Sequence, residues 1–112
     1  MSDTEKLKQD IIQEFGTPCA VIDLGIVEQN IMRLQALCDK AKLANRPHIK
    51  THKSPLLALR QIEAGATGIT CQKLGEAEVM VRAGVKDILI ATNIIGAAKS
   101  GTLTALLRDI SL

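Results

Sequence analysis

Two short stretches of this sequence make the same transition from a helix to a strand, and they set the expected architecture. Glu63-Ala64-Gly65-Ala66 and Arg82-Ala83-Gly84-Val85 each end a helical pattern just before an apolar, β-branched run. Glycine after the last helical residue is a common helix terminator. Strand-like runs and helical patterns alternate along the rest of the chain, which is typical of successive βα units with a parallel sheet.

The alternation predicts four βα units after an N-terminal helix. The predicted helices cover residues 3–15, 24–43, 55–64, 74–83 and 97–108, and the predicted strands cover 19–23, 46–51, 68–72 and 87–93. Ser54 and Pro55 have the residue types preferred at an N-cap and at the first helical position. Gly101 is expected to interrupt the last helix early. We expect residues 1–16 to be a helical lead-in and residues 17–112 to form one α/β unit.

Four βα units are about half of a (β/α)₈ barrel, which typically needs ~250 residues. A small open sheet of flavodoxin type is the competing architecture. The chain stops just after the helix of the fourth βα unit, where a fifth strand would begin, so we expect a fragment of a larger protein. A partial barrel leaves its first and last strands as open edges that invite pairing with another chain.

Composition narrows the classes of function. The chain has 112 residues, a net charge of +2, one Phe and no Trp or Tyr. Mixed charge and the lack of stacking side chains argue against nucleic acid as a partner. No apolar run approaches the ~18 residues of a spanning helix, so we expect a cytoplasmic protein with no membrane partner. Cys19, Cys38 and Cys71 have no metal-site spacing, and we expect reduced thiols buried in the core.

The basic stretch 46–53 is the expected site of chemistry. As a strand it would place His48, Lys50 and His52 on one face, like the wall of a polar pocket, with Ile49 on the other. A metal shared by the two histidines is disfavoured, because about 13 Å would separate them on a strand. A solvated basic segment without function is the plainer alternative.

Position favours a functional role for Lys50. It lies near the C-terminal end of a predicted parallel strand, where ligands bind in α/β folds. Nearby cations, Arg46, Lys53 and either histidine if protonated, would disfavour a charged ammonium. An uncharged lysine amine is the nucleophile that a Schiff base requires.

Three stretches together resemble one family of enzymes. They are Arg46-Pro47-His48-Ile49-Lys50-Thr51-His52-Lys53, the run from Gly68 to Glu78 that contains Gln72-Lys73-Leu74-Gly75-Glu76, and Asp87-Ile88-Leu89-Ile90. They resemble the N-terminal barrel of the D-threonine aldolase and D-serine dehydratase family, which are alanine-racemase-like, fold-type III pyridoxal-phosphate enzymes. Thr17-Pro18-Cys19-Ala20-Val21-Ile22-Asp23 is similar to the family's first strand.

The resemblance implies that Lys50 carries pyridoxal phosphate as a Schiff base. We expect His52 to be a proton-transfer or positioning group, because imidazole titrates near neutral pH. A structural hydrogen bond to neighbouring backbone is the alternative for His52. His48, Gln72 and Asn93 are expected to line the cofactor pocket, although Asn93 could instead cap the following helix. Glu76 and Glu78 are expected to serve only the dipole and solubility of their helix.

The implied reaction is retro-aldol cleavage of a D-3-hydroxy amino acid to glycine and an aldehyde. A D-serine dehydratase-like lyase and a non-catalytic pyridoxal-phosphate-binding single-barrel protein are the alternatives. In the family, later segments supply the phosphate grip and the ligands of a divalent metal, and the complete enzyme is expected to be a homodimer. No such ligand set is expected in this chain, which in isolation could be inactive.

Overall fold

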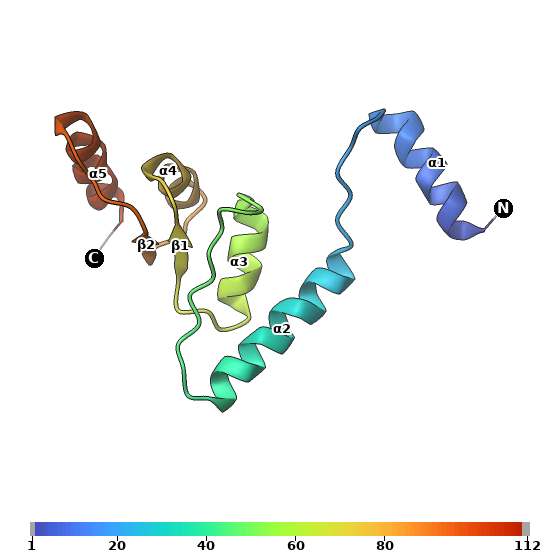
Figure 1. Cartoon of the computed structure of the whole chain (residues 1–112), viewed down its shortest axis with the longest axis horizontal. Coiled ribbons are helices and arrows are strands. Elements are labelled where there is room, and N and C mark those ends of the chain that lie inside the picture. The colour runs from blue at the N-terminus through green and yellow to red at the C-terminus, as the bar shows by residue number, and fades with distance from the viewer. Residues whose placement is uncertain (1, 111–112) are drawn as a thin grey trace.

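The computed structural model describes residues 2–110, which form an elongated chain of 57 × 38 × 22 Å. A compact α/β portion lies at one end and a single helix, α1, lies apart from it at the other (Figure 1). The elements are α1 (Asp3–Phe15), α2 (Leu24–Lys40), α3 (Pro55–Glu63), β1 (Ile69–Cys71), α4 (Leu74–Arg82), β2 (Ile88–Ile90) and α5 (Ala97–Asp109).

A small parallel sheet organises the compact portion. β1 and β2 pair in parallel, with Ile69 opposite Ile88. On the other side of β1, His48 forms a parallel bridge with Thr70, and Ile49 N donates to Thr70 O at 2.9 Å. The order across the sheet is therefore residues 46–49, then β1, then β2. The predicted α/β class with parallel strands is confirmed.

The first predicted strand, 19–23, is wrong. Val21 and Ile22 are 66% and 55% exposed, and no neighbouring strand pairs with this run within the described part of the chain. It forms an extended arm between α1 and α2 (Figure 1). Its apolar residues suit a buried strand, but pairing needs a partner strand beside it. Asp23 instead caps α2, because its Oδ1 accepts from Ile26 N at 3.0 Å.

The predicted helices are confirmed to within a few residues, because local signals set their ends. Ser54 Oγ accepts from Leu57 N at 3.4 Å, and Pro55 is the first residue of α3. Gly65 and Gly84 follow α3 and α4 with φ of 119° and 95°, a region that strongly favours glycine. α5 continues through Gly101, so the expected interruption is wrong.

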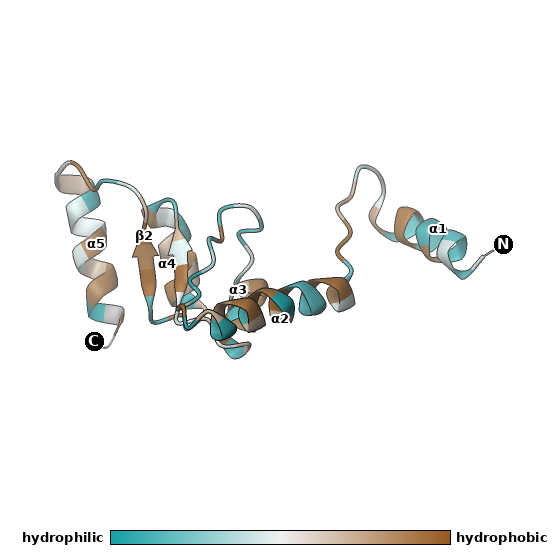
Figure 2. Cartoon of the chain, turned by 60° about the horizontal axis from the view of Figure 1, so that its bottom comes forward, coloured by the Kyte–Doolittle hydropathy of each residue, from teal (hydrophilic) through white to brown (hydrophobic). Residues whose placement is uncertain are grey.

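The core lies between the sheet and its helices. Its largest fully buried side chains are Ile49, Ile69, Cys71 and Met80, and α4 contacts both strands as well as α3 and α5. α2 departs from this pattern, because Leu34 and Leu37 are exposed and its one buried residue is Gln35. Brown segments along its ribbon in Figure 2 mark its apolar residues. Gln35 accepts from Asn45 and donates to Asp39, which fixes the C-terminal end of α2.

The three cysteines differ in environment, which corrects the expectation that all are buried. Cys71 is buried, Cys38 is partly buried and Cys19 is exposed on the arm. Burial, helped by the negative charge of Glu76, raises the pKa of the Cys71 thiol to about 11. Only about 0.1% of Cys71 would then be thiolate at pH 8, and the thiolate is the reactive form.

Iodoacetamide at pH 8 should therefore alkylate Cys19 at least ~100-fold faster than Cys71. Peptide mass mapping against time measures both rates in one sample. In concentrated urea, which unfolds the protein, the alkylation rates of Cys19 and Cys71 should converge. This control shows that the difference in the native protein comes from the fold and not from the local sequence. Equal rates in the native protein would contradict the buried position of Cys71.

Candidate active site

The candidate site residues follow the carboxyl ends of the parallel segments. Lys50 comes directly after Ile49, Gln72 directly after β1, and Asn93 three residues beyond the last residue of β2. Because parallel strands end at one edge of a sheet, all three lie toward the same edge. Lys50 and Asn93 are exposed and Gln72 is partly buried. Asn93 does not cap α5, whose N-cap is Gly96.

The predicted strand 46–51 is correct only as far as Ile49. Residues 50–52 form a turn, which Lys53 N closes by donating to Ile49 O at 2.8 Å. Lys53 itself has φ of 51°. The alternation expected for a strand therefore stops before Lys50, and the row of His48, Lys50 and His52 is not one strand face. Ile49 does lie on a different side from them, buried in the core.

Both histidines are fixed by backbone groups of the turn. His48 Nδ1 accepts from Lys50 N at 3.2 Å, and His52 Nδ1 accepts from Ser54 N at 3.0 Å. The structural hydrogen bond considered for His52 is thus present. An imidazole that accepts through Nδ1 carries its proton on Nε2 when neutral. Each Nε2 is buried and has no hydrogen-bond partner among residues 2–110.

Burial also lowers the pKa of His52. The nearby Gln61 side chain opposes this shift in part, although neither Gln61 Oε1 nor His52 Nε2 has a hydrogen-bond partner within the described chain. A lowered pKa keeps the imidazole neutral at pH 7. His52 is therefore available as a neutral donor through Nε2–H.

Glu76 has a larger role than helix solubility. Its carboxylate pairs with the Lys53 ammonium, and its Oε2 accepts from Gln72 N at 2.8 Å and from Lys73 N at 3.4 Å. The hydrogen bond from Lys53, above all, lowers the pKa of Glu76. A Glu three residues after the N-cap is a known capping signal, and it was present in the sequence at Lys73 and Glu76. Nothing in the sequence near Glu76 predicted its ion pair with Lys53, which lies 23 residues away.

Arg46 does not act on Lys50 as a free neighbouring cation. Its guanidinium binds both carboxylate oxygens of Asp87, at 2.7 and 3.1 Å, next to Gly68. These residues precede the strands, so the pair lies at the opposite end of the sheet from Lys50. The paired charges raise the pKa of Arg46 and lower that of Asp87. Lys53 is also paired, which leaves the expectation of unpaired cations around Lys50 wrong for both residues.

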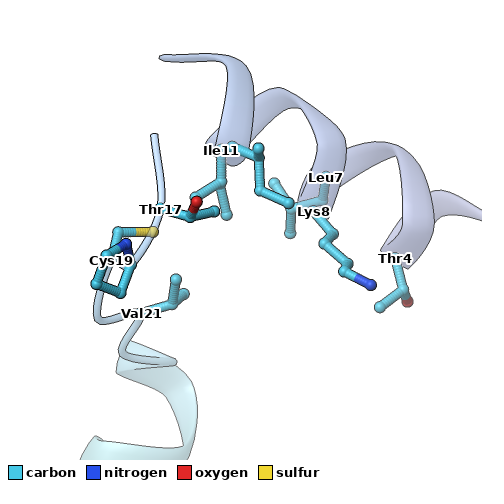
Figure 3. A pocket seen from close by; sticks show the side chains of 9 residues that line it. Thr4, Leu7, Lys8, Ile11, Thr17, Cys19 and Val21 are labelled. Atoms are coloured by element: carbon cyan, nitrogen blue, oxygen red, sulfur yellow. The ribbon is translucent and has the colours of Figure 1, made fainter. Parts of the chain in front are cut away.

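One apolar hollow is remote from this edge. A groove of about 440 Å³ separates α1 from the arm and is lined mainly by apolar side chains, among them Leu7, Ile11, Cys19 and Val21 (Figure 3). None of the candidate site residues lines it. A smaller hollow of about 240 Å³ lies between the turn and α4. It is lined by Ile49, Lys53 and residues of α4 that include Glu76.

Over residues 2–110, no three His, Cys, Asp or Glu side chains gather closely enough to hold a metal ion. No helix in the same range is long and apolar enough to cross a membrane.

Comparison with known proteins identifies relatives of the chain, although no family model matches it. D-threonine aldolase of Arthrobacter sp is 44% identical over 99 residues, which are 88% of this chain and 26% of the relative. D-threo-3-hydroxyaspartate dehydratase of Delftia sp. is 46% identical over 85 residues, 76% of this chain and 22% of the relative. The crystal structure of D-threonine aldolase from Filomicrobium marinum matches with a TM-score of 0.78 and 40% identity, over 80% of this chain and 24% of that chain.

The chain is similar over most of its length to D-threonine aldolase and to D-threo-3-hydroxyaspartate dehydratase. It spans about a quarter of the length of the curated relatives that it matches. Because the match to the Arthrobacter aldolase covers 99 of 112 residues, it necessarily includes the turn with Lys50 and both strands. The candidate site of this chain therefore lies within the region of family likeness.

Proposed function

We propose that this chain supplies the cofactor lysine, Lys50, of a pyridoxal-phosphate-dependent lyase that acts on D-3-hydroxy amino acids. The observation that carries the proposal is the turn itself: an exposed lysine at the carboxyl edge of a parallel sheet, between two imidazoles whose Nε2 atoms have no partner in the described chain. The family likeness supports it through relatives named for D-threonine and 3-hydroxy-D-aspartate.

The residues present fit this cofactor. An aldehyde needs an accessible amine, which Lys50 offers, and its anionic oxygens need hydrogen-bond donors. The Nε2–H groups of His48 and His52 are unpaired donors, and the amides of Gln72 and Asn93 lie toward the same edge. Pyridoxal phosphate, when bound, supplies the electron sink for charge that develops at the substrate's α-carbon. Lys50 would hold it, and His48, Gln72 and Asn93 would orient it.

His52 would act as a hydrogen-bond donor that holds the substrate. With Nδ1 occupied by Ser54 N–H, its neutral ring carries hydrogen on Nε2, so that atom donates and does not accept. The lowered pKa keeps it in this state at neutral pH. In retro-aldol cleavage the β-hydroxyl proton must leave, and a group outside this turn would have to take it. The positioning part of the role expected for His52 is thus favoured over that of a base.

The complete protein would carry the rest of the site. Residues 17–112 would form part of a (β/α)₈ barrel, which the parallel order of residues 46–49, β1 and β2 supports. Among residues 2–110 no set of side chains fits a divalent metal ion, so its ligands would come from other segments of the complete protein. We further propose a cytoplasmic homodimer for the complete enzyme.

Dehydration is the second candidate reaction, because the Delftia dehydratase is as similar to this chain as the Arthrobacter aldolase is. Both reactions begin with a D-3-hydroxy amino acid. An aldolase yields glycine and an aldehyde, whereas a dehydratase yields ammonia and a 2-oxo acid. Product analysis with D-threonine and D-threo-3-hydroxyaspartate separates them in the complete protein.

The cofactor role of Lys50 has a direct test in the full chain. Pyridoxal phosphate is added, the imine is reduced with borohydride, and peptide mapping locates the label. We expect Lys50 to be the main labelled residue and Lys50→Ala to lose at least ~90% of the total, because an amine is required for the imine. Lys86→Ala is the matched control, since Lys86 is also exposed, and it should leave Lys50 labelling unchanged. Labelling spread evenly over the surface lysines would contradict the proposal.

A further inference from the structure

One carboxylate connects the two loops that carry the candidate site. Glu76 lies in the first turn of α4, and its side chain is only 10% exposed. One of its oxygens pairs with Lys53 of the turn, and the other accepts from the backbone of Gln72 and Lys73. The turn and the end of β1 are thus joined through a single side chain.

We infer that Glu76 is a positioning residue that holds the turn carrying Lys50 and His52 against the end of β1 at Gln72. The inference rests on the proposed function, because it concerns the placement of Lys50. Glu76 itself is directed at Lys53 and the backbone, so it acts through other residues and is not itself a catalytic residue.

The backbone of the turn shows why such a hold is needed. Lys53 has φ of 51°, a left-handed conformation that is uncommon for residues other than glycine. Such conformations persist where the surroundings fix them. Lys53 is fixed at both ends, because its N–H donates to Ile49 O and its ammonium pairs with Glu76. Lys50 and His52 lie inside the loop that the first of these contacts closes, and the second ties the end of that loop to α4.

Simple helix capping does not account for the arrangement. Capping α4 needs only that Glu76 accept from backbone N–H groups at its start. The pairing with Lys53 adds a contact 23 residues away in sequence, to the turn of the candidate cofactor lysine. The same α4 turn offers a matched control, since Glu78 lies two residues further on and has no ion pair among the described residues.

The test compares amide hydrogen exchange in the full chain by NMR. Glu76→Gln removes the charge while keeping the shape, Lys53→Met removes the ammonium while keeping the stem, and Glu78→Gln is the control. We expect the amides of Lys53 and Ser54 to exchange about tenfold faster in both Glu76→Gln and Lys53→Met, because each variant breaks a charged hydrogen bond. Gln72 should accelerate only in Glu76→Gln. In Lys53→Arg, which keeps the positive charge, the amides at positions 53 and 54 should exchange as slowly as in the unmutated protein. Glu78→Gln should change the exchange rates of these amides and of Gln72 less than twofold.

A second readout concerns placement of the amine. In borohydride trapping, labelling of Lys50 relative to Lys86 should fall about fivefold or more in Glu76→Gln and remain unchanged in Glu78→Gln. If unmutated protein is not labelled at Lys50, the proposed function fails, and the exchange rates still decide the role of Glu76. If Lys53 and Ser54 exchange at the unmutated rate in both Glu76→Gln and Lys53→Met, the inference is overturned. Lys53 is 61% exposed, so Lys53→Met should fold even where Glu76→Gln does not.

Discussion

Gly68→Ala should lower the free energy of unfolding by about 3 kcal/mol, because the added methyl group has no space. A Cβ at Gly68 would lie 2.9 Å from Asp87 Cβ and closer still to the Asp87 carbonyl and the Arg46 guanidinium. The obstructing carbonyl belongs to the backbone and accepts from Ile69 N at 3.0 Å. Relief therefore requires β1 and β2 to separate at their start and disturbs the Arg46–Asp87 pair as well.

Urea unfolding followed by far-ultraviolet circular dichroism measures this loss, since the chain has no Trp or Tyr for fluorescence. Gly101→Ala is the matched control. A Cβ there meets nothing within 4 Å, and the residue lies inside α5. Alanine should stabilise that position by about 0.5–1 kcal/mol. The same exchange of glycine for alanine is thus expected to have opposite signs at the two sites, and equal effects would refute the crowding at Gly68.

Ile49→Ala should cost about 2–5 kcal/mol, the range for removing a large buried aliphatic side chain. Ile49 is 0% exposed and packs in the core cluster with Ile69 and Met80. Its backbone also bonds to Thr70 on one side and to Lys53 on the other. Truncation therefore removes core contacts at the residue from which the Lys50 turn starts.

Ile95→Ala provides the comparison for Ile49→Ala, because Ile95 is the same residue type but 74% exposed. Its substitution should change the free energy of unfolding by less than about 0.5 kcal/mol. Both proteins are measured by the same urea titration. A loss below ~1 kcal/mol for Ile49→Ala would mean that Ile49 is not part of a close-packed core.

The elements that the sequence predicted well are those whose ends depend on neighbouring residues. Ser54 with Pro55 predicted the start of α3, and Gly65 and Gly84 predicted where α3 and α4 end. Cap and turn preferences operate within a few residues, so a single sequence contains them. The parallel order of the sheet followed from the alternation of these elements.

The errors concern features that depend on distant partners. Residues 19–23 have the composition of a buried strand, but the sequence of these residues does not determine whether a partner strand lies beside them. The turn at 50–53 is set by contacts of Lys53 with Ile49 and Glu76, and β-branched Thr51 favoured an extended chain instead.

The candidate site was predictable in its residues and less so in its geometry. Lys50, Gln72 and Asn93 were expected at the carboxyl edge of the sheet, and the structure places all three after parallel segments. The fixed tautomers of the histidines depend on backbone hydrogen bonds within a turn that was not expected. Their roles, and those of Lys50, Gln72 and Asn93, remain proposals.

The placement of the Arg46–Asp87 pair bears on how such a chain could change over time. The pair and Gly68 join the strands where they begin, whereas Lys50, His52 and Gln72 follow the strands where they end. Substitutions in the loops at the carboxyl edge leave these joining contacts intact. During evolution, substitutions in these loops can therefore change the substrate that is bound, while the contacts at the opposite end of the sheet continue to stabilise the fold.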